Sequence, residues 1–161
     1  MTESSPIVHD PLPMRLRVDV SRQALDVLRG DLIEKTYLIS TSKFGLGAEP
    51  GSFRTPLGRF QIAEKIGGGA PLGAVFKSRL PTGEIACPGG EEDLILTRIL
   101  WLDGLDADNA NTRARYVYLH GTNQEALLGT PASHGCVRMA NRDIAELYDE
   151  IPEGTFVEIR A

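Results

Sequence analysis

The chain has 161 residues and a formal net charge of −5; 42% of its residues are hydrophobic and 24% are charged. This length suits one domain with a substantial core and is short for two. The acidic balance argues against broad nucleic-acid binding, which usually needs a basic face. No window approaches the roughly 18 apolar residues of a membrane span. We therefore expect a single domain with neither nucleic acid nor a membrane as its partner.

The N-terminal stretch, residues 1–13, is predicted to form an irregular arm, because its three prolines are incompatible with regular structure. The stretch also lacks the basic and apolar segments of a secretory signal. We therefore expect a cytoplasmic protein, in which the two cysteines, Cys87 and Cys136, stay reduced. Cys87 is interpreted as a residue at a strand end, with a partnership with Cys136 as the alternative.

Residues 14–161 are predicted to form one domain built mainly from strands. Residues 15–20 alternate apolar and charged side chains, the period of two that is typical of a half-buried strand. Further strand candidates, with turn residues between them, are 24–28, 35–41, 55–65, 74–80, 83–87, 94–102, 113–121 and 155–159. A short helix is an alternative for 94–102. Many short strands separated by turns favour a β-sandwich or barrel.

One short helix is predicted late in the chain. Its apolar face follows the i, i+3, i+4, i+7 spacing of a helix, with Ile144, Leu147, Tyr148 and Ile151. Asn141 is the candidate N-cap, and Pro152 with Gly154 ends the helix.

A cysteine and two histidines form the main candidate site. Cys136 follows His134 by two residues, and in an extended segment their side chains would share a face. A thiol becomes a useful nucleophile when a nearby base takes its proton. His120, at the end of a strand candidate, is the natural base for Cys136. Gly121, next to this histidine, permits a close backbone approach.

Two neighbours of the cysteine fit the same chemistry. Gly135 permits a sharp bend, and consecutive backbone N–H groups in such a bend can stabilise a tetrahedral oxyanion. Arg138 offers a forked donor that suits a carboxylate.

Two other interpretations of these residues stay open. A zinc site is possible from His120, His134, Cys136 and Cys87, although the paired spacing of common zinc ligands is missing. Each residue can also be purely structural, since a lone cysteine often behaves as a small core residue.

The chain resembles the YkuD-type L,D-transpeptidase catalytic domain family from about residue 15 onward. The resemblance rests on "HGT" at 120–122 and "SHGCVRM" at 133–139, followed by Asn141 and Asp143. It also includes "GSFRTPLGRFQI" at 51–62, which resembles the T-P-x-G-x-F segment of the family.

The resemblance implies a β-rich cysteine enzyme that needs no metal or organic cofactor and acts on peptidoglycan stem peptides. Such enzymes cleave between a diamino acid and the terminal D-alanine, and carbapenem-type β-lactams acylate them. Cys136 would be the nucleophile and His120 the base. Ser133, His134 and Gly135 would shape the site and its oxyanion hole. Arg138 would orient the substrate or the catalytic loop.

Neither an export signal nor an accessory wall-binding domain is visible. We therefore expect a cytosolic L,D-carboxypeptidase that trims tetrapeptide muropeptides during murein recycling, without an obligate protein partner. The alternatives are an L,D-transpeptidase in wall cross-linking, a non-catalytic muropeptide-binding module, and a zinc-binding module.

Overall fold

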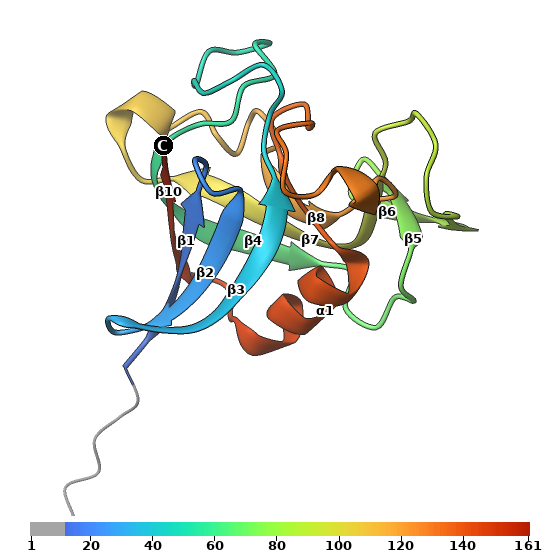
Figure 1. Ribbon diagram of the computed structural model, residues 1–161, viewed down its shortest axis with the longest axis horizontal. Coiled ribbons are helices and arrows are strands. Elements are labelled where there is room, and N and C mark those ends of the chain that lie inside the picture. Colours follow the sequence, from blue (N-terminus) through green and yellow to red (C-terminus); the bar gives the residue numbers. More distant parts are fainter. Residues whose placement is uncertain (1–11) are drawn as a thin grey trace, which may run out of the picture.

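The computed structural model describes residues 12–161, which form ten strands and one α-helix (Figure 1). The strands are β1 (Met14–Asp19), β2 (Ala24–Arg29), β3 (Leu32–Ser40), β4 (Gly58–Ile66), β5 (Ala74–Lys77), β6 (Leu80–Ile85), β7 (Ile95–Gly104), β8 (Tyr118–Gly121), β9 (Val137–Met139) and β10 (Phe156–Arg160). The helix is α1 (Asn141–Glu150), and short 3₁₀ turns span Ala107–Asn109 and Glu125–Leu127. The arm expected at residues 1–13 lies outside the described residues except for its last two.

The sheet closes into a barrel. Its strands follow the order β4–β10–β1–β2–β3–β9–β8–β7, and β7 pairs back with β4 to complete an eight-stranded ring. The pairs β1–β10 and β8–β9 are parallel, and the other neighbours are antiparallel. The hairpin of β5 and β6 extends from β7 on one side of the barrel (Figure 1). The prediction of a mainly β domain with one late helix is confirmed, and the barrel is the correct alternative.

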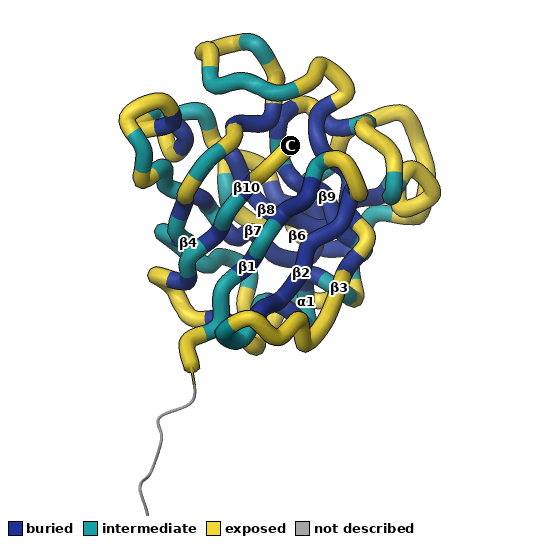
Figure 2. Tube along the Cα trace, turned by 60° about the vertical axis from the view of Figure 1, so that its left-hand side comes forward, coloured by how far each residue is buried: buried dark blue, intermediate teal, exposed yellow. Residues whose placement is uncertain are grey.

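Alternating side chains fill the barrel. Leu16 and Val18 on β1, and Phe60 and Ile62 on β4, point inward at positions two apart and are almost fully buried. The apolar face of α1 packs into the same core through Ile144 and Leu147, and Ile151, which directly follows the helix, joins them. Figure 2 shows that β2 is buried along most of its length, whereas exposed residues lie in the connecting loops and in the first half of β3.

Two strand predictions were wrong in extent. Residues 74–80 form a hairpin rather than one strand, because Ser78 and Arg79 both adopt positive φ, 48° and 64°, and reverse the chain. Only the end of 113–121 is a strand, since backbone bonds of Arg115 and Tyr116 to the residues three before them hold that part in turns. Residues 95–102 of the predicted 94–102 lie in strand β7, so the helix alternative was wrong.

The predicted helix is present, but its N-cap is Ala140 rather than Asn141. Asn141 is the first helical residue. Its backbone N–H donates to the Glu125 carboxylate at 2.8 Å, and its side-chain amide donates to the carbonyl of Thr122 at 2.9 Å. A carboxylate from the preceding loop therefore satisfies an N–H at the helix start and ties the helix to the end of β8. None of the helices within residues 12–161 has the length and apolar character to cross a membrane.

Candidate active site

The two segments with the site residues lie side by side. Strands β8 and β9 run parallel, with His120 opposite Arg138. Because side chains alternate along a strand, His120 and Arg138 share one face with Cys136, which directly precedes β9. Leu119 and Val137 point the other way and are buried in the barrel core. The fold therefore brings the cysteine, one histidine and the arginine onto one face of adjacent strands.

A tight turn presents Cys136. The Ser133 hydroxyl accepts the N–H of Gly135 at 3.2 Å and donates to the carbonyl of Cys136 at 2.6 Å. Gly135 has φ of 121°, which favours glycine. Thr55, from the T-P-x-G segment, donates to the Gly135 carbonyl at 3.0 Å. The Gly135 N–H is thus engaged, whereas the Cys136 N–H has no hydrogen-bond partner within residues 12–161 and is the better candidate oxyanion donor.

The thiol of Cys136 is partly buried and contacts two backbone groups. Its sulfur accepts the backbone N–H of Tyr118 at 3.3 Å and donates to the carbonyl of Tyr116 at 3.4 Å. Burial raises the pKa of the Cys136 thiol to about 12, although the Tyr118 N–H favours the thiolate. The group is therefore a neutral thiol at pH 7 and needs a base at the moment of attack.

His120 has the properties of such a base. Its Nδ1 lies 2.6 Å from the carbonyl oxygen of Gly121, and because a carbonyl can only accept, Nδ1 carries the hydrogen and Nε2 is the acceptor. Burial lowers the pKa of His120 below its usual 6.5, so the ring is neutral at pH 7. A side chain at Gly121 would collide with the carbonyl of Leu96. No hydrogen bond joins His120 to Cys136 in the described part of the chain, and the base assignment stays a prediction.

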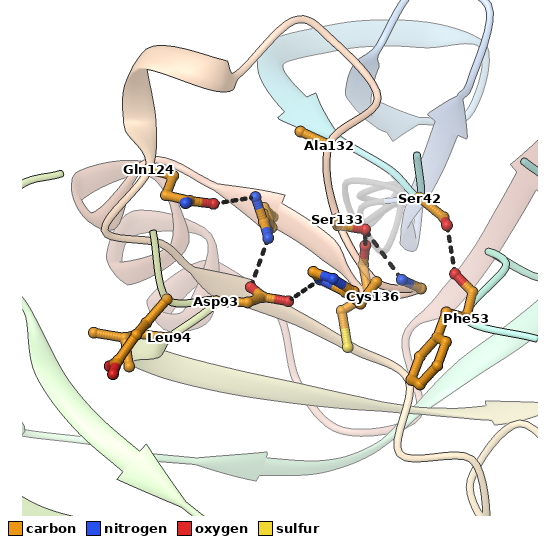
Figure 3. Close-up of polar contacts among 12 residues, drawn as sticks. Ser42, Phe53, Asp93, Leu94, Gln124, Ala132, Ser133 and Cys136 are labelled. Carbon is orange, nitrogen blue, oxygen red and sulfur yellow. Dashed lines mark hydrogen bonds and ion pairs between the residues drawn. The ribbon is translucent and has the colours of Figure 1, made fainter. Parts of the chain in front are cut away.

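Asp93 is a site residue that the sequence did not reveal. Its two oxygens accept from His134 Nδ1 at 2.8 Å and from Arg138 Nη2 at 2.7 Å, so its carboxylate links these two side chains (Figure 3). Arg138 also donates to the side chain of Gln124 at 2.8 Å, and its side chain is only 1% exposed. These contacts favour bracing of the catalytic loop over direct contact with a substrate.

A small pocket opens beside the cysteine. It has a volume of about 260 Å³ and is lined by Phe53, Arg115, Tyr116, His134 and Cys136 among others. His134 lies at its exposed rim, 6.0 Å from the ring of Phe53. Arg115 lay in a segment predicted as strand, and no motif indicated that it reaches the site.

The residues considered for zinc do not converge. Within residues 12–161, no group of three or more His, Cys, Asp or Glu side chains is arranged to hold a metal ion. Cys87 is exposed and Cys136 is partly buried, and both are free thiols. The alternative that paired these two cysteines was therefore wrong.

The family of the chain follows from its comparison with known proteins. Residues 13–159 match the model of the YkuD family, described as the L,D-transpeptidase catalytic domain, and the chain belongs to this family. It is 28% identical over 151 residues to YkuD of Bacillus licheniformis, a protein that has the name of an L,D-transpeptidase. That match covers 93% of this chain and 67% of the relative.

Solved structures share the fold. An L,D-transpeptidase from Xylanimonas cellulosilytica superposes with a TM-score of 0.62 at 20% identity, over 98% of this chain and 65% of that one. The L,D-transpeptidase LdtMt1, solved in complex with imipenem, superposes with a TM-score of 0.58 at 20% identity, over 91% and 58%. The chain thus spans less than two thirds of these solved relatives.

Proposed function

We propose that the protein is a cysteine acyl-transfer enzyme that acts on peptidoglycan stem peptides, at the bond between the diamino acid and the terminal D-alanine. The observation that supports this most is that the Cys136 thiol and a buried neutral imidazole, that of His120, share one face of the adjacent strands β8 and β9, in a member of the L,D-transpeptidase family. The alternative, a non-catalytic binding module, would have the same fold, but it would need neither a buried thiol nor a neutral histidine.

In the acylation step, the sulfur of Cys136 attacks the carbonyl carbon of the diamino acid while Nε2 of His120 takes the thiol proton. Because the thiol has a pKa of about 12, proton transfer accompanies bond formation rather than preceding it. The developing oxyanion lies toward the backbone N–H of Cys136. Protonated His120 then gives its proton to the nitrogen of D-alanine, which leaves as the free amino acid.

The resulting thioester is resolved by a second nucleophile. His120 takes a proton from water, the hydroxide adds to the thioester carbonyl, and the tripeptide acid leaves as Cys136 regains its proton. An acceptor amine can replace water only if the protein positions it, since bulk water competes at about 55 M. The pocket beside the cysteine has about 260 Å³, which is small even for one ligand. We therefore favour the L,D-carboxypeptidase over the L,D-transpeptidase.

A β-lactam gives an independent probe of the nucleophile. LdtMt1 is a structural relative that was solved with imipenem. We propose that imipenem acylates Cys136 by the same attack on a carbonyl carbon, with opening of the β-lactam ring. Intact mass spectrometry would show one adduct per chain. The cytoplasmic location and the role in murein recycling stay predictions, which cell fractionation can test.

The proposed function is tested with a purified disaccharide tetrapeptide. Mass spectrometry follows the loss of D-alanine, with a second stem peptide present as a potential acceptor. We expect disaccharide tripeptide and free D-alanine with little cross-linked dimer, and no product with Cys136→Ala. Efficient dimer formation would restore transpeptidation, and binding without any product would favour the binding module.

A further inference from the structure

The pocket beside Cys136 is a cleft between two segments that are distant in the sequence. One wall is the loop with Pro50, Gly51 and Phe53, and the other is the turn at 114–117 that leads into β8. The Ser42 hydroxyl donates to the carbonyl of Phe53 and holds the first wall in place (Figure 3). The cysteine lies where the two walls meet, so any group in the pocket lies beside the reacting sulfur.

Arg115 brings a positive charge to this pocket. Its guanidinium spans the cleft and donates to the carbonyls of Gly47 at 3.4 Å and Arg54 at 2.9 Å, and to the hydroxyl of Ser52 at 3.4 Å. All three acceptors are neutral, and two of the bonds are long. Arg115 forms no ion pair with a carboxylate within residues 12–161; the acid whose charge acts on it, Glu49, is exposed.

The absence of a direct ion pair within residues 12–161 is unusual for a half-buried arginine. Buried charges are normally paired, because removal from water costs free energy that a counter-ion must offset. Burial lowers the pKa of Arg115, yet a guanidinium stays protonated at pH 7. By contrast, Arg138, which does not line the pocket, is paired with Asp93. The charge of Arg115 therefore remains available for an anion that enters the pocket.

We propose that Arg115 is the substrate-recognition residue that binds the terminal carboxylate of the donor peptide and so selects for a free C-terminal D-alanine. The inference rests on the proposed function, since it assigns a binding residue to the terminal D-alanine of the same substrate. A guanidinium binds a carboxylate through two parallel charge-assisted hydrogen bonds. The small volume of the pocket suits the one-residue leaving group, whereas the donor side continues through the stem to a disaccharide and needs an open path.

The test compares two substrates that differ only at the proposed contact. One is a disaccharide tetrapeptide with diaminopimelate at position three and a free terminal carboxylate; the other ends in D-alaninamide. We expect wild type to have a kcat/KM roughly 10- to 100-fold higher for the acid, as for a lost hydrogen bond to a charged group. Arg115→Gln should lower the rate for the acid by a similar factor and leave the amide almost unchanged.

This comparison separates recognition from a bracing role. If Arg115 only holds the two walls together, Arg115→Gln slows both substrates equally, and the proposal is overturned. The matched control is Arg113→Gln, which removes the same charge two residues away from an exposed arginine that pairs with Glu64. It should leave the acid-to-amide ratio unchanged. A third peptide, amidated at the side-chain carboxylate of diaminopimelate, should behave like the acid; a loss of rate as large as with D-alaninamide would overturn the assignment to the terminal carboxylate.

A binding measurement keeps the inference independent of turnover. Calorimetry with Cys136→Ala should show the acid binding roughly 10- to 100-fold more tightly than the amide, and Arg115→Gln in that background should remove the difference. Equal binding of acid and amide overturns the proposal for Arg115. Preferential binding of the acid, in a wild-type protein that releases no D-alanine, would instead overturn the proposed function and leave the recognition residue standing.

Discussion

Arg138 and Arg115 both place positive charge near the sulfur of Cys136, and both favour its thiolate, yet their surroundings differ. Arg138 is buried on β9, paired with Asp93 and bonded to Gln124. Arg115 comes from a turn, spans an open pocket and meets only neutral acceptors. Arg138, whose charge is neutralised by Asp93, can stabilise the loop but cannot readily bind a substrate anion. Arg115 can bind one.

This difference changes the interpretation of the sequence motif. A forked donor next to the cysteine suggested a carboxylate partner in the substrate, but the partner of Arg138 is a carboxylate of the protein itself. The nearby arginine with spare charge lies more than twenty residues earlier in the chain. The two sides of the cysteine thus have separate tasks, one of holding and one of recognition.

The largest expected effect is at the sulfur of Cys136, which lies near both arginines. Cys136→Ser should lower kcat by about 10³-fold or more, because a serine hydroxyl is a weaker nucleophile that the same neutral imidazole cannot activate. The melting temperature should change little, since the side chains have nearly the same size. D-alanine release by this variant at a rate near that of wild type would remove the basis for assigning the nucleophile.

The next largest effect is expected at His120, the proposed base. His120→Gln should lower kcat/KM by about 10²- to 10⁴-fold. In wild type, kcat/KM should fall at low pH with a midpoint below the usual histidine value of 6.5, because burial lowers the pKa of His120 and only the neutral ring accepts a proton. Ionisation of the thiol should not enter the profile until near pH 12. Persistence of the same acid limb in His120→Gln would point to another group, with His134 as the first candidate.

The smallest effect compares the two arginines directly. Arg138→Lys keeps the charge but loses the fork that joins Asp93 to Gln124, so the free energy of unfolding should fall by about 1–3 kcal/mol. Arg115→Lys should cost less than about 0.5 kcal/mol, because two of its three hydrogen bonds are long and the third is exposed. Thermal unfolding of the pair measures both. Equal losses would show that the two arginines brace the structure alike, and would break the contrast between them.

Much of the fold was predictable because it depends on local alternation. The strand at 15–20 and the helix face around Ile144 follow their periodicities, and the structure places both as expected. The hairpin at Ser78 and Arg79 was missed, since neither residue type usually adopts the positive φ that reverses the chain there. The pairing of β7 with β4, which closes the barrel, could not be predicted either, because the periodicity of a strand does not specify its partner.

The site divides in the same way. Its motif residues were identifiable because they are close in sequence, and strands β8 and β9 place His120 and Cys136 on one face. Asp93 gave no comparable signal, because it is the last of three consecutive acids in a polar stretch and resembles a solvated loop. Arg115 was hidden within a segment that resembled a continuous strand. Such long-range electrostatic partners have no spacing rule, so only the fold reveals them.

The proposed mechanism requires that Cys136 forms a thioester with the stem peptide. Rapid acid quenching of the enzyme with excess disaccharide tetrapeptide, followed by intact mass spectrometry and peptide mapping, tests it most directly. We predict a covalent adduct on Cys136 with the mass of the disaccharide tripeptide acyl group, formed together with one equivalent of free D-alanine and absent from Cys136→Ala. Release of D-alanine without any adduct on Cys136, or with undiminished turnover in Cys136→Ala, would contradict it.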